Sequence, residues 1–252
     1  MVLDPDVLAA ELAQELLGDP LDEIEPEAAG SADVAAECDL GLSLLTGSHD
    51  ERLQGLRIFC EHRDPRAIPQ LLPLLEAACP IERMSAVYAL GRNPSPMAVE
   101  PLLALLAADS NGYVRKAVAW SLANFADAPV LNPLIRSLQV DVAAVRLWAA
   151  TSLADVGATG AAKADPAAAQ LLQSLRIDSE AAVRSNSAWA LGRLYPDLVE
   201  PRQQAVVQAL LHTLLEDQEA SVRDEARLAL EQLEQPEVLE RLQTLVDEGL
   251  LS

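Results

Sequence analysis

The sequence predicts an all-α fold, a right-handed α-solenoid of about six helical hairpins. Three observations predict it. Half of the 252 residues are hydrophobic but only 3% are aromatic, and an Ala- and Leu-rich composition favours closely packed helices over sheets. A pattern centred on one arginine recurs every 31 to 39 residues. Each copy follows a second apolar segment with helical spacing, and hairpins that repeat in this way bury their apolar faces by stacking.

The second helix of each predicted hairpin contains the repeated arginine. A weak copy has Arg52 in this place, and five clear copies have Arg83, Arg115, Arg146, Arg184 and Arg223. Counted from this arginine, small or apolar residues occupy positions +3, +4, +6, +7 and +8, so these positions form the packed faces. Positions +1, +2, +5 and +9 share one side of the helix and form an open face, which is expected to line the concave surface of the stack.

The first helix of each hairpin carries an apolar stripe. These helices are expected from Ala32, Ala67, Ala98, Val130, Ala167 and Val206, and a closing helix is expected from Glu237. Residues 157–166 and 192–203 lengthen two connections, and their Gly and Pro residues predict surface loops.

An aspartate lies just before the second helix in four repeats, where it could cap the helix or accept hydrogen bonds between repeats. With the repeated arginines these residues predict a structural ladder, in which Arg side chains satisfy carbonyl and carboxylate groups of neighbouring repeats. The arginines are Arg83, Arg115, Arg146, Arg184 and Arg223, and the aspartates are Asp109, Asp141, Asp178 and Asp217.

Charge is distributed unevenly along the chain. Acidic residues outnumber basic ones 39 to 18, a formal charge of −21, and residues 1–50 contain thirteen acids and no Lys or Arg. We therefore divide the chain into an acidic N-terminal helix (Asp6–Leu17) and linker (Gly18–Gly30), together residues 1–30, and a repeat domain over 31–252. Such an acidic chain repels nucleic acid, so no nucleic-acid partner is expected.

Features of targeting are missing from the sequence. No apolar stretch reaches the length of a secretory signal core or a membrane span, so membrane insertion is not expected. Three cysteines give no disulfide framework. These observations predict a cytoplasmic location.

The repeats resemble a known family. The pattern D-x-x-x-x-V-R-x-x-A-A-x-A-L-G is nearly complete in Asp178–Gly192 and clear in Asp109–Ala123, and it is similar to the short HEAT-like repeats of the phycobilisome-lyase type. A cyanobacterial HEAT-repeat partner of the A-type iron–sulfur carrier is also similar. The resemblance implies a role in iron–sulfur assembly or phycobilisome maintenance.

Aromatic and charged residues gather on the predicted open face. All three tryptophans lie at its positions, although tryptophan is more often a core residue. Trp, Tyr and Arg are the residue types that carry most interface energy, so this face is the predicted groove for a protein partner. Its predicted residues are Tyr88, Arg92, Lys116, Trp120, Asn124, Trp148, Asp155, Trp189 and Arg193.

Metal binding is the alternative use of the cysteines and histidines. Cys60, His62 and Cys79, together with His49, could converge in the turns and hold zinc or an iron–sulfur cluster. The sequence nevertheless has no CxxC motif, and a cysteine among apolar neighbours usually serves as a small hydrophobic residue. The expectation is therefore no metal and no cofactor.

Recognisable catalytic motifs are missing as well, including the P-loop, GxSxG and HExxH. The sequence thus predicts a non-catalytic scaffold or adaptor, an assembly or maintenance factor that grips a protein partner. The alternative is a bilin lyase or chromophore-handling subunit, in which the same groove stacks a tetrapyrrole and pairs its propionates. A third hypothesis is an iron–sulfur carrier that uses Cys60 and Cys79.

Overall fold

The computed structural model describes residues 31–251, and within this range all regular structure is helical. The first helices of the hairpins are α2 (Ser31–Leu44), α4 (Ile68–Leu74), α6 (Pro96–Ala108), α8 (Leu131–Val140), α10 (Ala161–Ile177) and α12 (Glu200–Glu216). The second helices are α3 (His49–Glu61), α5 (Pro80–Arg92), α7 (Gly112–Ser121), α9 (Ala143–Gly157), α11 (Ala181–Leu194) and α13 (Ala220–Gln232). The remaining elements are α14 (Pro236–Asp247) and three short 3-10 helices, η1 (Pro65–Ala67), η2 (Leu122–Phe125) and η3 (Tyr195–Asp197).

The prediction of an all-α solenoid made of six hairpins is thereby confirmed. The predicted N-terminal helix (Asp6–Leu17) and linker (Gly18–Gly30) lie outside the described residues. The described chain forms two compact units that divide after Asn93, and each is considered by itself below. The prediction of one repeat domain over 31–252 stays a prediction.

The first unit contains α2 to α5. Helix α2 packs on α3, and both α3 and α4 pack on α5. Leu56 and Phe59 of α3 are fully buried between them. Helix α3 begins with a capping box, in which Ser48 and Glu51 each accept a hydrogen bond from the other's backbone, and this satisfies two amide groups of the helix start.

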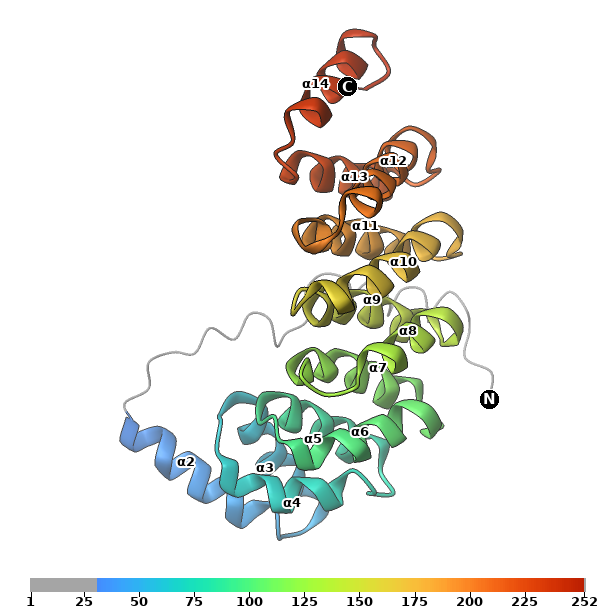
Figure 1. Cartoon of the computed structure of the whole chain (residues 1–252). Coiled ribbons are helices and arrows are strands. Elements are labelled where there is room, and N and C mark those ends of the chain that lie inside the picture. Colours follow the sequence, from blue (N-terminus) through green and yellow to red (C-terminus); the bar gives the residue numbers. More distant parts are fainter. Residues whose placement is uncertain (1–30, 252) are drawn as a thin grey trace. The chain divides into compact units, whose positions relative to one another are not determined.

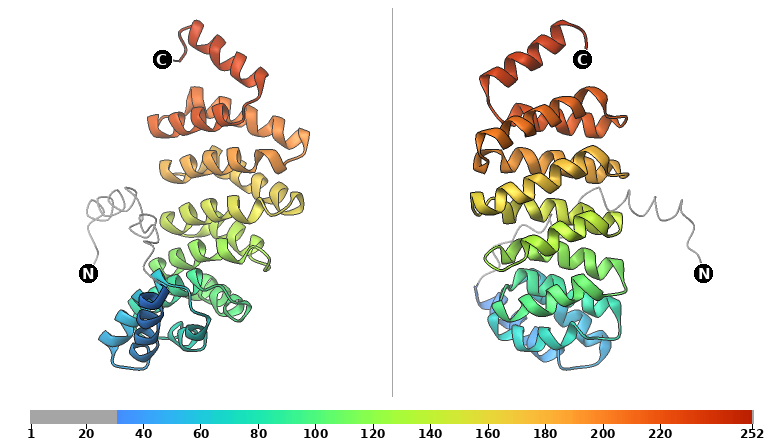
Figure 2. Two further views of the ribbon diagram at one scale, coloured as in Figure 1. Left: turned by 90° about the vertical axis from the view of Figure 1, so that its left-hand side faces the viewer. Right: turned by 45° about the vertical axis from the view of Figure 1, so that its right-hand side comes forward.

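The second unit contains α6 to α14 in two layers. The second helices α7, α9, α11 and α13 pack on one another in sequence order, and the first helices α6, α8, α10 and α12 form the other layer (Figures 1 and 2). Helix α14 packs on α13. Each hairpin therefore buries one side against the hairpin before it and the other side against the hairpin after it, as a repeat stack requires.

Packing follows the pattern of small residues in the second helices. In α9, Ala149, Ala150, Leu153 and Ala154 have no exposed surface, and they occupy positions +3, +4, +7 and +8 of the repeat. Position +8 of α11 is Gly192, where an added Cβ would lie 3.2 Å from the Cβ of Ala229. Small residues thus allow consecutive second helices to approach closely.

The prediction of surface loops over 157–166 and 192–203 is largely wrong. Helix α10 already begins at Ala161, and α12 begins at Glu200 after η3. The extra residues lengthen these two first helices to 17 residues each, against 10 in α8. Four alanines in Ala161–Ala167 have high helix propensity, which outweighs the missing amide of Pro166.

Candidate interaction surface of the second helices

The three tryptophans lie in consecutive second helices of the second unit, at positions +5, +2 and +5 of the repeat. Trp120 of α7, Trp148 of α9 and Trp189 of α11 are each half-buried. The adjacent columns of Ala and Leu fill the interior, so the larger indoles keep one side in solvent. We define the second-helix face as Lys116, Trp120, Asn124, Trp148, Thr151, Asp155, Asn186, Trp189 and Arg193.

Polar contacts fix the register of neighbouring helices on this face. The Asn186 Nδ2 group donates a hydrogen bond to Thr151 Oγ1 at 2.8 Å. Asn186 is at position +2 of α11 and Thr151 is at position +5 of α9, so these positions meet across the helix pair. Below the face, Ser152 Oγ donates to the Ala119 carbonyl at 2.8 Å and joins α9 to α7.

Arg193 already has partners within the chain. Its guanidinium lies over the Trp189 ring, 5.5 Å from the ring centre, and its Nη2 atom lies 2.8 Å from Asp155 Oδ1. Both charged side chains are well exposed, so the ion pair is weak and exchangeable. An acidic group of a partner would have to replace Asp155 at this position.

Lys116 and Asn124 frame the α7 end of the second-helix face. Lys116 is half-buried and Asn124, in η2, is exposed. In the first unit, Tyr88 and Arg92 of α5 occupy the positions equivalent to Trp120 and Asn124, and both are half-buried. The Arg92 Nε group donates to the Cys60 carbonyl at 3.2 Å. Of the predicted groove residues, the structure brings Arg193, Trp189 and Asp155 into contact, whereas Tyr88 and Arg92 belong to the other unit.

The repeated arginines join consecutive hairpins of the second unit. Arg146 donates from Nε and Nη2 to the two carboxylate oxygens of Asp178, at 2.8 and 2.7 Å, and from Nη1 to the Asp141 carbonyl at 2.9 Å. The pairs Arg115–Asp141 and Arg184–Asp217 have the same bidentate geometry. This arrangement places a rigid, charge-assisted link at each junction between repeats.

The aspartates of this ladder are C-terminal caps of the first helices. Asp109, Asp141, Asp178 and Asp217 follow α6, α8, α10 and α12, whereas the N-cap residues of the second helices are Asn111, Val142, Glu180 and Glu219. The alternative of helix N-caps was therefore wrong. Each Asp carboxylate instead accepts a hydrogen bond from a backbone amide one or two residues later in the turn.

Hydrogen bonds within the ladder favour the charged forms of three arginines and of Asp217. The Arg184 guanidinium holds the pKa of the Asp217 carboxyl below its usual value, against the opposing effect of burial. Hydrogen bonds from the Asp partners raise the pKa of Arg115, Arg146 and Arg184. The Arg184–Asp217 rung therefore stays ionised around neutral pH.

The family follows from the repeats. A family model described as HEAT repeats matches residues 42–123, 68–155, 99–192 and 168–249, which together cover most of the chain. The chain belongs to the HEAT repeat family. The subfamily of the phycobilisome-lyase type stays an expectation.

Solved structures with the same fold agree with the HEAT assignment. Escherichia coli YibA has 16% identity and a TM-score of 0.56, covering 98% of this chain and 92% of its own. A designed armadillo repeat protein has 20% identity and a TM-score of 0.54, covering 82% of this chain and 95% of its own. Kap95p has 17% identity and a TM-score of 0.58, covering 97% of this chain and 36% of its own. At these identities the likeness shows the fold.

Among curated proteins, none matches the HEAT chain by sequence. Within residues 31–251, no helix combines the length and the apolar character needed to cross a bilayer.

The end residues of the predicted ladder bind backbone groups. Arg83 donates from Nη1 to the carbonyls of Ala77 and Ala78, and Arg223 donates to those of Asp217 and Gln218. In the first HEAT hairpin, Arg52 donates to Glu82 Oε1 at 2.7 Å and to the Gly47 carbonyl at 3.0 Å. Glu82 therefore accepts the hydrogen bond from the repeated arginine that an Asp accepts in the later repeats.

Sequence reasoning missed Glu82 and Asn93. Glu82 is almost fully buried and also lies 3.1 Å from His49 Nδ1. Asn93 is buried after α5, and its Nδ2 group donates to the carbonyls of Phe59, His62 and Ala89. A polar residue at a position where the later repeats have Phe125, Val156, Leu194 and Leu233 was the available signal for Asn93.

The candidate metal ligands are not assembled in the first unit. The Cys60 thiol donates to the Ser85 carbonyl at 3.7 Å, and burial raises its pKa to about 12. His62 Nε2 lies 2.6 Å from Glu37, and Cys79 is the N-cap residue of α5. In residues 31–251 no three His, Cys, Asp or Glu side chains are placed to share an ion, so the hypothesis that Cys60, His62 and Cys79 converge was wrong.

Proposed function

We propose that this HEAT protein is a non-catalytic scaffold that binds a protein segment along its second-helix face. Trp120, Trp148 and Trp189 are the anchors. The observation that carries the proposal is that all three tryptophans, one in each of three consecutive second helices, are half-buried, although an indole gains most by complete burial. A partner that covers the exposed side of these rings completes that burial and gains affinity.

The rigidity of the stack supports the same function. Bidentate Arg–Asp pairs at three junctions and the Asn186–Thr151 hydrogen bond hold the helices in one register. A face fixed in advance loses little conformational entropy when a partner binds. Lys116 at the α7 end and Arg193, after exchange of Asp155, supply cations for acidic groups of the segment.

Proteins of similar fold bind extended or folded partners. The designed armadillo repeat protein forms a complex with the peptide (KR)4, and Kap95p binds RanGDP. We propose by analogy that this chain also binds a polypeptide. From the resemblance of its repeats, we place that partner in iron–sulfur assembly or phycobilisome maintenance.

The test compares capture of partners from the native host by the full chain and by the Trp120→Ala/Trp189→Ala variant. We expect the double variant to lose at least about tenfold in captured partner, because buried Trp anchors typically contribute 2 kcal/mol or more. Tyr113→Ala is the matched control, because it removes an exposed aromatic residue of α7 outside the face. Equal capture by both variants, with native helicity, contradicts the proposal.

A chromophore-handling role is tested with the same proteins. If a bilin changes its visible absorbance on mixing with the native chain but not with the double variant, the face binds a tetrapyrrole. Unchanged spectra together with a retained protein partner reject this alternative.

A further inference from the structure

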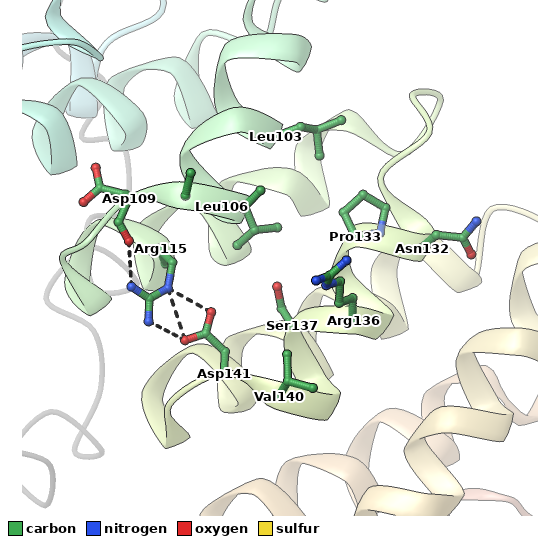
Figure 3. A pocket seen from close by; sticks show the side chains of 12 residues that line it. Leu103, Leu106, Asp109, Arg115, Asn132, Pro133, Arg136, Ser137, Val140 and Asp141 are labelled. Atoms are coloured by element: carbon green, nitrogen blue, oxygen red, sulfur yellow. Dashed lines mark hydrogen bonds and ion pairs between the residues drawn. The ribbon is translucent and has the colours of Figure 1, made fainter.

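A second surface lies on the first helices, away from the second-helix face. A groove of about 600 Å³ runs between α6 and α8. Figure 3 shows Leu103 and Leu106 on one side of it, Arg136 and Val140 on the other, and the Arg115–Asp141 ion pair at one end. All of these residues belong to the second unit.

The walls of this groove expose apolar surface. Val140, at the end of α8, is 73% exposed, and Leu103 is half-buried. Ile177, in the equivalent position of α10, is 71% exposed, and it lines the next groove along the stack together with Val140. Branched aliphatic side chains exposed side by side at the ends of consecutive helices are costly in water, and such patches mark interaction sites.

The charges in the groove favour an acidic occupant. The Asp141 carboxylate is occupied by Arg115 Nε and Nη2, at 2.9 and 2.6 Å. The Asp109 carboxylate accepts from the Asn111 amide. Arg136 is exposed, and its guanidinium has no hydrogen-bond or ion-pair partner in the part of the chain that the structure describes. A carboxylate is the group that complements it.

Other occupants fit this combination less well. A basic segment would bring like charges together at Arg136. A wholly apolar segment would cover the guanidinium and leave its donors unpaired, which opposes binding. An apolar side chain next to a carboxylate satisfies both parts of the groove.

We infer that the groove between α6 and α8 is a second docking site, which binds an acidic, leucine-bearing segment of a partner protein. An aliphatic side chain of that segment packs between Leu103 and Val140, and a carboxylate pairs with Arg136. This inference goes beyond the proposed function, because it uses the other helix layer and selects a partner by charge. One scaffold would then hold two protein segments at once.

The test is calorimetric titration of the full chain with a short synthetic peptide of Leu, Ala and Glu whose leucines recur every three or four residues. About 0.15 M salt limits repulsion by distant charges, because the Debye length is then about 8 Å. We expect saturable binding that weakens about tenfold or more when Gln replaces each Glu of the peptide, and a similar loss with the Arg136→Glu chain.

Matched controls separate this site from general effects. Arg57→Glu makes the same change in net charge at an exposed position of α3, and we expect it to bind like the native chain. Val140→Asp removes the apolar contact without touching Arg136, and we expect it to lose binding. The Trp120→Ala/Trp189→Ala variant retains the peptide, so failure of this inference and failure of the proposed function are distinguishable.

Three results would overturn the inference. They are no binding by the native chain, equal binding of the Glu and Gln peptides, or native affinity in the Arg136→Glu chain. Self-association that Val140→Asp abolishes would instead make a second copy the occupant. Tighter peptide binding after removal of residues 1–30 would make that acidic segment the occupant, and either result would overturn the assignment to a partner.

Discussion

At the scale of the residue, each rung of the ladder is an arginine shared between two repeats. Arg146 uses Nε and Nη2 for the carboxylate of the following repeat and Nη1 for a carbonyl of its own turn. The side chains of Arg146 and Asp178 are 16% and 6% exposed. Each charged group has therefore lost most of its hydrogen bonds to water, and the other group replaces them. A rung of this kind supports structure and leaves the second-helix face free for binding.

Replacing a central rung should destabilise the stack. We expect Arg146→Ala to lower the free energy of unfolding by about 2 kcal/mol, less than the 3–5 typical of fully buried pairs, because both side chains keep some contact with water. Urea unfolding followed by far-UV circular dichroism measures it. Arg57→Ala, in an exposed pair with Glu61, is the control and should change little; an equal shift in both variants would contradict the structural role.

The stability contributed by Asp217 should depend on pH. Its pKa is lowered in the folded chain by Arg184, so the contribution is present above the unfolded value of about 3.9 and is lost as pH falls through the folded value. We expect Asp217→Asn to destabilise the protein at pH 7 and to match the native chain at pH well below 3.9, where the protonated Asp resembles Asn. Urea midpoints across this range measure the difference, and a constant difference would be evidence against this contribution.

At the scale of the element, small residues set the distance between helices. Gly55 of α3 faces α2, and an added Cβ would lie 3.0 Å from both the Gly41 carbonyl oxygen and the Leu45 amide nitrogen. Backbone atoms of a packed helix cannot move aside as a side-chain tip can. The hairpin α2–α3 therefore needs glycine at this position because of a close approach.

Gly55→Ala should therefore be destabilising although Ala is the better helix former. Overpacking costs typically 1–3 kcal/mol and helix propensity returns at most about 1, so we expect a net loss of about 1 kcal/mol. Gly112→Ala is the control, since its Cβ would meet Val142 Cγ2 at 3.4 Å and Arg115 Nη2 at 3.9 Å, both ordinary van der Waals distances, and we expect no loss there. Thermal unfolding measures both; a gain in Tm for Gly55→Ala would show that α2 shifts to accommodate the methyl group.

At the scale of the whole molecule, charge is segregated along the chain. Residues 51–216 contain sixteen acids and fifteen bases, whereas residues 1–30 contain nine acids and no base. Most bases of the balanced segment are used within the fold, as the ladder and the Arg202–Asp165 pair show. The net charge of −21 is therefore concentrated towards the two ends, and it opposes self-association.

Removal of residues 1–30 should lower solubility, because the formal charge falls from −21 to −12. The concentration of polyethylene glycol at half-precipitation measures this, with a chain that keeps its length but has Asn and Gln for the nine acids as the control for charge. Unchanged solubility of the truncated chain would contradict this role. Tighter capture of the partner by the truncated chain would show in addition that these residues compete for it.

Particular residues show how far the sequence could predict the structure. The 3.6-residue period and the recurring arginine were enough for six hairpins and for the packed columns, because each helix must bury the same stripe in every repeat. The helical start of α10 was missed because the residues 161–166 give opposite signals. The alanines favour a helix, whereas Pro166 lacks the backbone amide that a helix interior uses. The role of Glu82 was missed because Glu82 directly precedes Arg83, the repeated arginine of its own hairpin. It nevertheless pairs with Arg52, the arginine of the preceding hairpin.

The all-α repeat architecture follows from the sequence alone, and the helical period predicts that Trp120, Trp148 and Trp189 share one side of the second helices. These follow from local periodicity, which a stack of equivalent hairpins preserves. Three features became clear only from the packed repeats: Arg193 is occupied by Asp155, Arg115 pairs with Asp141 of the following hairpin, and Arg136 stands unpaired, among the described residues, beside an apolar groove. These are contacts between residues 26 to 38 positions apart or surfaces formed by two helices, and their partners depend on how the repeats pack.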